Sequence, residues 1–337
     1  MTLIRAALRR SQSQIRHVEP VRPDEARGVV AEVYDQVERD FGMLAPPVSL
    51  HSPAPDVLAA AWMMLRETLL TGGNTGRELR EAVATAVSRR NVCPYCIEVH
   101  GSTLDALVRD DTGAAENVEI GMVTDWVRGS GGIPPGDAGR LAELTGVAVT
   151  FQYLNRMVHV FLGESPLPQE VPAVARKYAR RVLGRFLLPS ADALPSNGAS
   201  LDFLPAATLP GDLSWAEGSS TVADAFARAS TAVEKAGVRA LSAPVREVVL
   251  DALWDWDGQL PGPSRSWVEP LLSGVSGSDR TAGRLALLTA IAPYQVDDDL
   301  VREFALAHRE DRTLVEGVAW ASLAAARRSG ELLSGGA

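Results

Sequence analysis

Apolar residues recur at helical spacing along almost the whole chain, and this periodicity constrains the fold more than any other feature. In the stretch 24–41, which Gly42 follows as a stop signal, they recur at i, i+3, i+4 spacing: Val30, Val33, Tyr34, Val37 and Phe41. The same pattern is found at 56–70, 78–90, 142–161, 170–187, 222–236, 244–256, 281–292 and 313–328. Alternating β-branched runs and tight hairpin dipeptides are scarce. The sequence therefore predicts an all-α protein.

The helical pattern is interrupted once, between residues 188 and 218. This segment is rich in Pro, Ser, Gly and Ala and has no helical period, although Leu201, Phe203 and Leu204 would let it pack on a surface. We therefore expect four parts: an N-terminal extension over 1–22, a helical domain over 23–187, a linker over 188–218 and a second helical half over 219–332. The basic extension is typical of either a transit peptide or an amphipathic starter helix.

Two pairs of segments suggest that the halves arose by duplication. "LREAVATAV" (79–87) resembles "VREVVLDAL" (245–253), and "GVAVTFQYLNR" (146–156) resembles "GVAWASLAAAR" (317–327), in the same order. Extending the first alignment places Gln259, Gly262 and Ser266 where the first half has two cysteines and a histidine. The second half is then expected to be redox-inactive.

Composition narrows the possible functions. The 33 Lys and Arg residues against 42 Asp and Glu residues give a net charge of −9, which disfavours a nucleic-acid partner. No uncharged apolar run is long enough to span a membrane, so we expect no membrane partner. Two cysteines in 337 residues do not form a secreted disulfide scaffold. We therefore expect a cytoplasmic protein, where a CxxC pair is typical of redox, catalytic or metal chemistry.

Both cysteines lie in "NVCPYCIEVHG" (91–101). Pro94 fits the first position of a helix, which would put Cys93 at the N-cap and Cys96 in the first turn. The positive end of the helix dipole favours thiolate there, so we expect a lowered pKa for Cys96. His100 follows Cys96 by one helical turn and could take its proton.

Glu81 is placed to complete this group. It lies opposite the apolar stripe of the preceding helix and has only small neighbours, which would allow a second helix to pack closely on that side. If that second helix is the one that starts at Pro94, Glu81 faces His100. A carboxylate, a histidine and a thiol in sequence can act as a proton relay.

The spacing of Glu81, Cys93, Cys96 and His100 resembles the signature of the AhpD-like (alkylhydroperoxidase D, carboxymuconolactone decarboxylase) superfamily of all-helical proteins. The four-residue motif covers about 20 residues, and weaker similarity extends over 28–165, including "NRM" at 155–157. The resemblance implies that Cys96 attacks the peroxide, that Cys93 resolves the product into a disulfide, and that His100 and Glu81 move the proton.

One position departs from the family pattern. Tyr95 stands where the well-known hydroperoxidase has a histidine, and a tyrosine is a poor base near neutral pH. We therefore list Tyr95 as a possible modulator that shortens the proton relay. Elsewhere, Arg156 could anchor the end of a helix, but core packing is the favoured interpretation of this residue.

Three other interpretations of the cysteines stay open. CPYC is also the glutaredoxin tetrapeptide, but a helix rather than a strand precedes it here. A zinc site could draw on Cys93, Cys96, His100 and Glu81. Finally, the cysteines could be small core residues with His100 as a satisfied polar group.

The leading hypothesis is a thiol-dependent peroxidase or disulfide oxidoreductase without cofactor or metal. It would use a peroxide or other small oxidant, an external dithiol reductant of the lipoyl or thioredoxin type, and would assemble as a homo-oligomer. Two alternatives are a carboxymuconolactone decarboxylase-like lyase or isomerase acting on a small acid or lactone, and a non-enzymatic redox sensor or binding protein.

Overall fold

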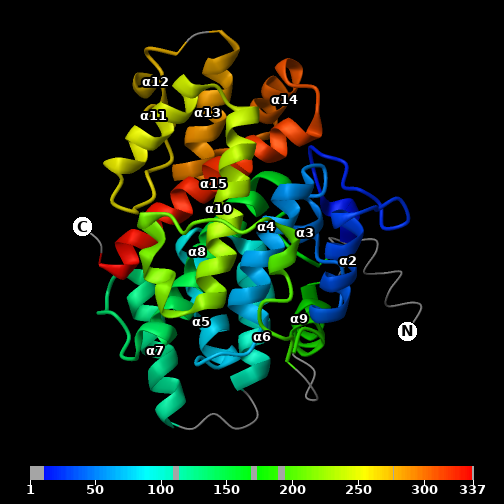
Figure 1. Ribbon diagram of the computed structural model, residues 1–337, viewed down its shortest axis with the longest axis vertical. Coiled ribbons are helices and arrows are strands. Elements are labelled where there is room, and N and C mark those ends of the chain that lie inside the picture. Colours follow the sequence, from blue (N-terminus) through cyan, green and yellow to red (C-terminus); the bar gives the residue numbers. More distant parts are fainter. Residues whose placement is uncertain (1–10, 109–113, 168–172, 189–193, 276, 336–337) are drawn as a thin grey trace.

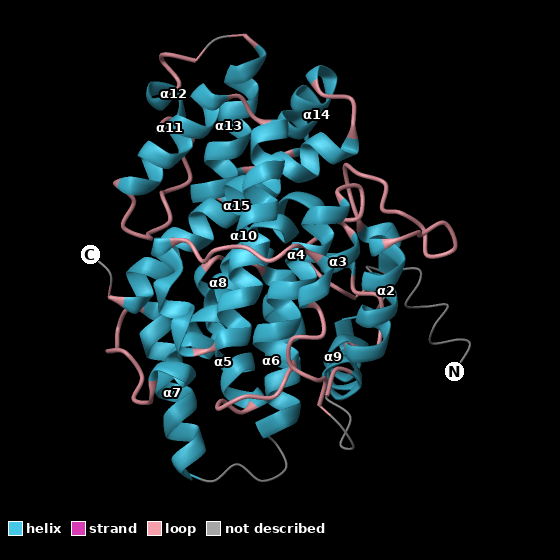
Figure 2. Cartoon of the chain, viewed as in Figure 1, coloured by secondary structure: helices cyan, strands magenta, loops and turns pink. Residues whose placement is uncertain are grey.

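Helices form all the regular structure in the residues described by the computed structural model, which are 11–108, 114–167, 173–188, 194–275 and 277–335 (Figures 1 and 2). The prediction of an all-α fold is therefore confirmed. Of the predicted 1–22 extension, residues 1–10 lie outside the described residues. No helix within the described ranges is long and apolar enough to cross a membrane.

The elements of the first part of the chain include one 3-10 helix (η1) and one π-helix (η2). They are η1 (Ser11–Gln14), α2 (Val29–Asp40), α3 (Pro46–Ser49), α4 (Pro55–Leu65), η2 (Arg66–Leu70), α5 (Arg77–Arg90), α6 (Pro94–Val108), α7 (Ala114–Arg128), α8 (Ala138–Phe161) and α9 (Ala173–Phe186). The periodicity did not predict α7, because its buried residues occupy only the last turns: Val123, Trp126 and Val127.

The elements of the second part include three 3-10 helices. They are η3 (Leu201–Phe203), η4 (Gly211–Gly218), α10 (Ser220–Ala240), α11 (Ala243–Trp254), α12 (Val268–Leu271), α13 (Ser278–Ile291), η5 (Pro293–Gln295), α14 (Asp298–Ala307) and α15 (Asp311–Ser334). The periodicity also did not predict α14, whose apolar spacing is a single turn long: Leu300, Val301 and Phe304.

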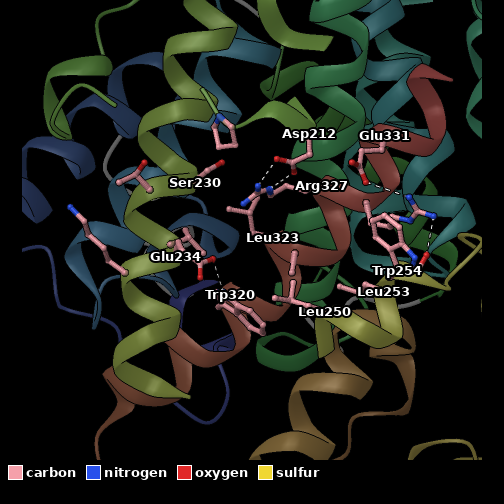
Figure 3. A pocket seen from close by; sticks show the side chains of 16 residues that line it. Asp212, Ser230, Glu234, Leu250, Leu253, Trp254, Trp320, Leu323, Arg327 and Glu331 are labelled. Atoms are coloured by element: carbon pink, nitrogen blue, oxygen red, sulfur yellow. Dashed lines mark hydrogen bonds and ion pairs between the residues drawn. The ribbon is translucent and has the colours of Figure 1, made fainter. Parts of the chain in front are cut away.

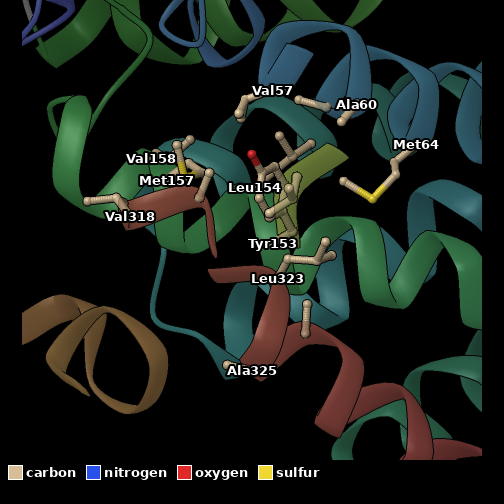
Figure 4. Close-up of a cluster of buried hydrophobic side chains, with 14 of the residues drawn as sticks. Val57, Ala60, Met64, Tyr153, Leu154, Met157, Val158, Val318, Leu323 and Ala325 are labelled. Carbon is tan, nitrogen blue, oxygen red and sulfur yellow. The ribbon is translucent and has the colours of Figure 1, made fainter. Parts of the chain in front are cut away.

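The core is built around α8 and α15, two helices of 24 residues that pack against each other. From residue 142 to 161 only His159 of α8 is more than slightly exposed. A helix that is buried on nearly all sides lies in the centre of a bundle. Figure 4 shows Tyr153 and Met157 of α8 among side chains of α4 and α15. The two parts of the chain therefore contribute to one hydrophobic core.

Residues 189–193 of the predicted linker lie outside the described residues, and its part from 194 to 218 packs on this core. It carries η3 and η4, and η4 contacts α8, α10 and α15. Leu213 and Ala216 of η4 are completely buried. A stretch with no helical period in its sequence thus becomes a structured surface layer, because its scattered apolar residues find a hydrophobic face.

Close packing of α10 on α15 generates a testable prediction at Gly237. A Cβ added there would overlap the ring of Trp320, which is buried and rigid. Gly237→Ala should therefore lower the free energy of unfolding by about 1–3 kcal/mol in urea titrations. The same change at Gly121, which is exposed on α7 with open space around it, should raise stability by up to about 1 kcal/mol. Equal effects at the two sites would contradict the packing argument.

Candidate functional site

A tight turn between α5 and α6 sets the position of Cys93. The Val92 N–H donates to the Arg89 carbonyl (3.1 Å) and the Cys93 N–H donates to the Ser88 carbonyl (2.9 Å). These two bonds form a Schellman motif, whose left-handed position normally holds glycine. Val92 occupies it with φ of 52°, a strained conformation for a β-branched residue. The turn leaves Cys93 directly before Pro94, the first residue of α6, as predicted.

Both thiols are free and buried. Cys93 is 1% exposed and Cys96 is 4% exposed. Burial raises the pKa of the Cys96 thiol well above its usual range, and hydrogen bonding to Cys93 and its charge act in the same direction. Only a hydrogen bond from the Asn155 side chain works to lower this pKa. The expected low pKa of Cys96 is therefore wrong for this closed state, because desolvation outweighs the helix dipole.

Glu81 and His100 meet between α5 and α6, as the sequence predicted. His100 Nδ1 lies 2.8 Å from Glu81 Oε2, and Arg77 binds the other carboxylate oxygen through Nε (2.9 Å) and Nη2 (2.7 Å). Burial acts to raise the pKa of Glu81, but the charge of Arg77 and then that of His100 outweigh it, so this pKa is lowered. The carboxylate is ionised and only accepts hydrogen bonds, so the proton of His100 sits on Nδ1.

That tautomer leaves His100 Nε2 with a lone pair, which is what a general base requires. The His100 ring packs edge-on against Phe151 of α8, with ring centroids 4.4 Å apart, so its orientation is fixed from two sides. Within the described residues, Cys96 forms side-chain hydrogen bonds with Cys93 and Asn155 rather than with His100. Glu81 and His100 are therefore in contact as expected, while the thiol lies in a separate polar contact.

Tyr95 lies between the cysteines and is 5% exposed. Burial raises the pKa of Tyr95 far above its ordinary value, and the neighbouring Cys96 and Cys93 add to this effect. The phenol therefore stays protonated at any physiological pH. It can pack or donate a hydrogen bond, but it has no capacity to accept a proton as the histidine of the family pattern would.

The sequence analysis missed a row of polar residues on α8 beneath the thiols. They are Gln152, Asn155, Arg156 and His159. Their spacing of i, i+3, i+4 and i+7 puts them on one face of the helix, and this spacing could have revealed the polar row from the sequence. Arg156 lies inside α8 and is 1% exposed, so the favoured interpretation of core packing is confirmed and the alternative of a helix-end anchor is not.

A cavity of about 720 Å³ lies away from the thiols, between α10, α11 and α15 (Figure 3). Its walls combine Leu250, Trp254 and Leu323 with an ion pair between Asp212 and Arg327. Neither cysteine lines it, so this hollow does not serve thiol chemistry. Within the described residues, no three His, Cys, Asp or Glu side chains converge in a way that could hold a metal ion.

The depressed pKa of Glu81 makes its contribution to stability pH-dependent. At pH 7, Glu81→Gln should lower the free energy of unfolding by roughly 3 kcal/mol, because Arg77 loses its buried counter-charge. The carboxylate stabilises the fold above its unfolded pKa, and this stabilisation is lost as the pH falls through the lower folded pKa. The difference between wild type and variant should therefore shrink below about pH 4.3.

Urea titrations across this pH range provide the measurement. Glu38→Gln is the matched control, since Glu38 is exposed on α2 and should change stability by less than about 0.5 kcal/mol. A gap between wild type and Glu81→Gln that stays constant down to pH 3 would refute the assignment of Glu81 as a buried carboxylate.

Comparison with known proteins places the chain in a family. Neither a family model nor a solved structure matches it. It is, however, 37% identical over 328 residues to a protein of Mycobacterium tuberculosis named alkyl hydroperoxide reductase Rv2159c, and the alignment covers 94% of each chain. At this identity and coverage, the chain belongs to the same family as that alkyl hydroperoxide reductase.

Proposed function

We propose that this protein is an AhpD-like dithiol peroxidase that reduces alkyl hydroperoxides. The observation that carries the proposal is the buried Glu81–His100 pair beside a CxxC pair at a helix start. The name of the relative from Mycobacterium tuberculosis supports the choice of alkyl hydroperoxide as substrate. Cys96 is the attacking thiol, Cys93 the resolving thiol, and His100 with Glu81 moves the proton.

The reaction takes place in two steps on the protein. The Cys96 thiolate attacks one peroxide oxygen, which forms Cys96–SOH and releases the alcohol ROH once the alkoxide takes up a proton. The Cys93 thiol then displaces water from the sulfenic acid, and a Cys93–Cys96 disulfide forms. An external dithiol of lipoyl or thioredoxin type reduces this disulfide by thiol exchange. The sum converts ROOH and a dithiol into ROH, water and a disulfide.

The geometry explains what each group contributes. An imidazole with its proton on Nδ1 offers Nε2 of His100 as the acceptor, and the ionised Glu81 stabilises the imidazolium that forms. Arg77 keeps Glu81 ionised during this change. Because both thiols are buried, a peroxide reaches them only when the surrounding helices move apart. When the helices close again, they exclude water from the sulfenic acid. We also propose self-association, as the family resemblance implies.

Replacing each cysteine singly by serine should block peroxide turnover at a different step. Each variant is therefore the control for the other. Cys96→Ser should lose dihydrolipoamide-dependent or thioredoxin-dependent peroxide consumption by at least about 100-fold, since no thiolate attacks. Cys93→Ser should consume one equivalent of peroxide and stop as the Cys96 sulfenic acid, detected by dimedone labelling and mass spectrometry. Equal turnover by Cys96→Ser and wild type would refute the peroxidase proposal.

Tyr95→Phe tests whether the phenol takes part in proton transfer. Because burial keeps Tyr95 protonated, its loss should change kcat/KM for peroxide by less than about threefold and leave the pH–rate profile unshifted. His100→Gln is the contrasting variant, expected to lose about 100-fold or more through loss of the general base. A shifted pH profile in Tyr95→Phe would show that Tyr95 belongs to the relay.

A further inference from the structure

Arg156 is a buried cation with no acidic partner. Its side chain is 1% exposed in the C-terminal part of α8, and no ion pair of the described residues includes it. Burial, and to a smaller extent the charge of Arg90, lower the pKa of Arg156 to about 9. Placing an unpaired charge in a protein interior is expensive, so such a group usually has a functional reason to be there. The proposed function assigns Arg156 no role.

A chain of amide side chains connects Arg156 to the attacking thiol. Arg156 Nη1 donates to Gln152 Oε1 at 2.7 Å, and Asn91 Nδ2 donates to the same oxygen at 3.0 Å. Asn91 Nδ2 also donates to Asn155 Oδ1 at 3.0 Å. The Asn155 side chain in turn forms the hydrogen bond that favours the thiolate of Cys96.

This chain is closed to water and fixed at its ends. Asn91, Gln152 and Asn155 are each less than 5% exposed. Asn155 Nδ2 is also held by Ser88 Oγ at 3.2 Å, and the Asn91 carbonyl is held by His159 Nε2 at 2.9 Å. Because such a buried site has a low dielectric constant, charges and hydrogen bonds along this chain are only weakly screened.

Two groups from the second part of the chain hold the guanidinium in place. Arg156 Nε donates to the carbonyl of Ala290 in α13 at 2.9 Å. The guanidinium carbon also lies 5.7 Å from the ring centroid of Trp256, at a distance that favours a cation–π contact. Neither group neutralises the charge. The second part of the chain, which lacks cysteines, therefore holds Arg156 of the first part in position.

Arg90, the other cation near Arg156, is half-buried and donates to the backbone carbonyls of Val127 and Gly258. The remaining charged groups around Cys96 are balanced or neutral. On α5, Glu81 is shared by Arg77 and His100, and on α6, Glu98 pairs with Arg180 of α9 at 2.8 Å. On α8, burial lowers the pKa of His159, which favours its neutral form. Tyr95 stays protonated. Arg156 is therefore the buried positive charge in this neighbourhood that has no negative partner among the described residues.

We propose that Arg156 is a positioning residue that supplies the counter-charge for the Cys96 thiolate, acting through Gln152, Asn91 and Asn155. In the reduced state the Cys96 thiol is protonated and uncharged, so the desolvation cost falls on the unpaired Arg156 cation alone. Loss of the Cys96 proton creates the negative charge that compensates Arg156. The attraction between the two charges thereby lowers the free energy of the thiolate relative to the thiol.

This inference rests on the proposed role of Cys96 as the attacking thiol, yet its test needs no peroxide. In a Cys93→Ala background, the Cys96 pKa is measured from the pH dependence of iodoacetamide alkylation and of thiolate ultraviolet absorbance. Arg156→Met should raise this pKa by at least about one unit, which is a tenfold loss of thiolate at a given pH. Arg156→Lys should restore most of the loss because it keeps the charge.

Arg228→Met is the matched control. Arg228 is a half-buried arginine on α10 that also binds backbone carbonyls, those of Leu201 and Leu204, but lies outside the polar chain. Its replacement should leave the Cys96 pKa unchanged. A folded Arg156→Met protein with the wild-type Cys96 pKa would overturn the inference, and so would an Arg156→Lys protein no better than Arg156→Met.

Gln152→Met provides a second test in case Arg156→Met does not fold, as judged by circular dichroism. It keeps the cation but removes the oxygen shared by Arg156 and Asn91, so the Cys96 pKa should rise by about 0.5 unit or more, a threefold loss of thiolate. An unchanged pKa in the folded Gln152→Met protein would overturn the relay. If these shifts appear while peroxide turnover is absent, the counter-charge stands and the peroxidase proposal falls.

Discussion

The burial of α8 on nearly all sides is the constraint on which the rest of the structure depends. Helices from both parts of the chain surround it, including α4, α5, α13 and α15, so its polar side chains have no water to bind. Each must find a partner inside the protein or bear the cost of an unmade hydrogen bond. Gln152, Asn155 and Arg156 meet this demand together with Asn91, and Asn155 also forms a hydrogen bond with Cys96.

The site separates its two ionic tasks in space. Glu81 and Arg77 of α5 form one group with His100 of α6, in which one carboxylate is shared by two partners. The polar chain that ends at Asn155 and Cys96 is a second group, and its one full charge is that of Arg156. In the proposed function, the proton acceptor comes from the first group and the inferred counter-charge of the thiolate from the second.

Local sequence predicted the parts of the site that depend on one or two neighbouring helices. Pro94 fixed the start of α6, and the small residues around Glu81 indicated close packing of α5 on α6, so the Glu81–His100 contact followed. Helices α7 and α14 escaped detection because their apolar stripes are too short to establish a period. The sequence did not indicate the surroundings of Arg156, because they come from distant parts of the chain. Asn91 shares the Gln152 oxygen with Arg156, and Ala290 lies 134 residues away in the sequence.

By itself, the sequence determined the helical class, the position of Cys93 at a helix start and the pairing of Glu81 with His100. These depend on spacing within a helix and on the proline, glycine and small-residue signals that are written locally. Tertiary structure alone decided how acidic Cys96 is. The dipole of α6 favours the thiolate, but packing of the surrounding helices removes water from the sulfur, and desolvation is the larger effect. It also decided that Arg156 would lie unpaired beneath that sulfur, because only the folded chain brings α8, α13 and the turn at Asn91 together.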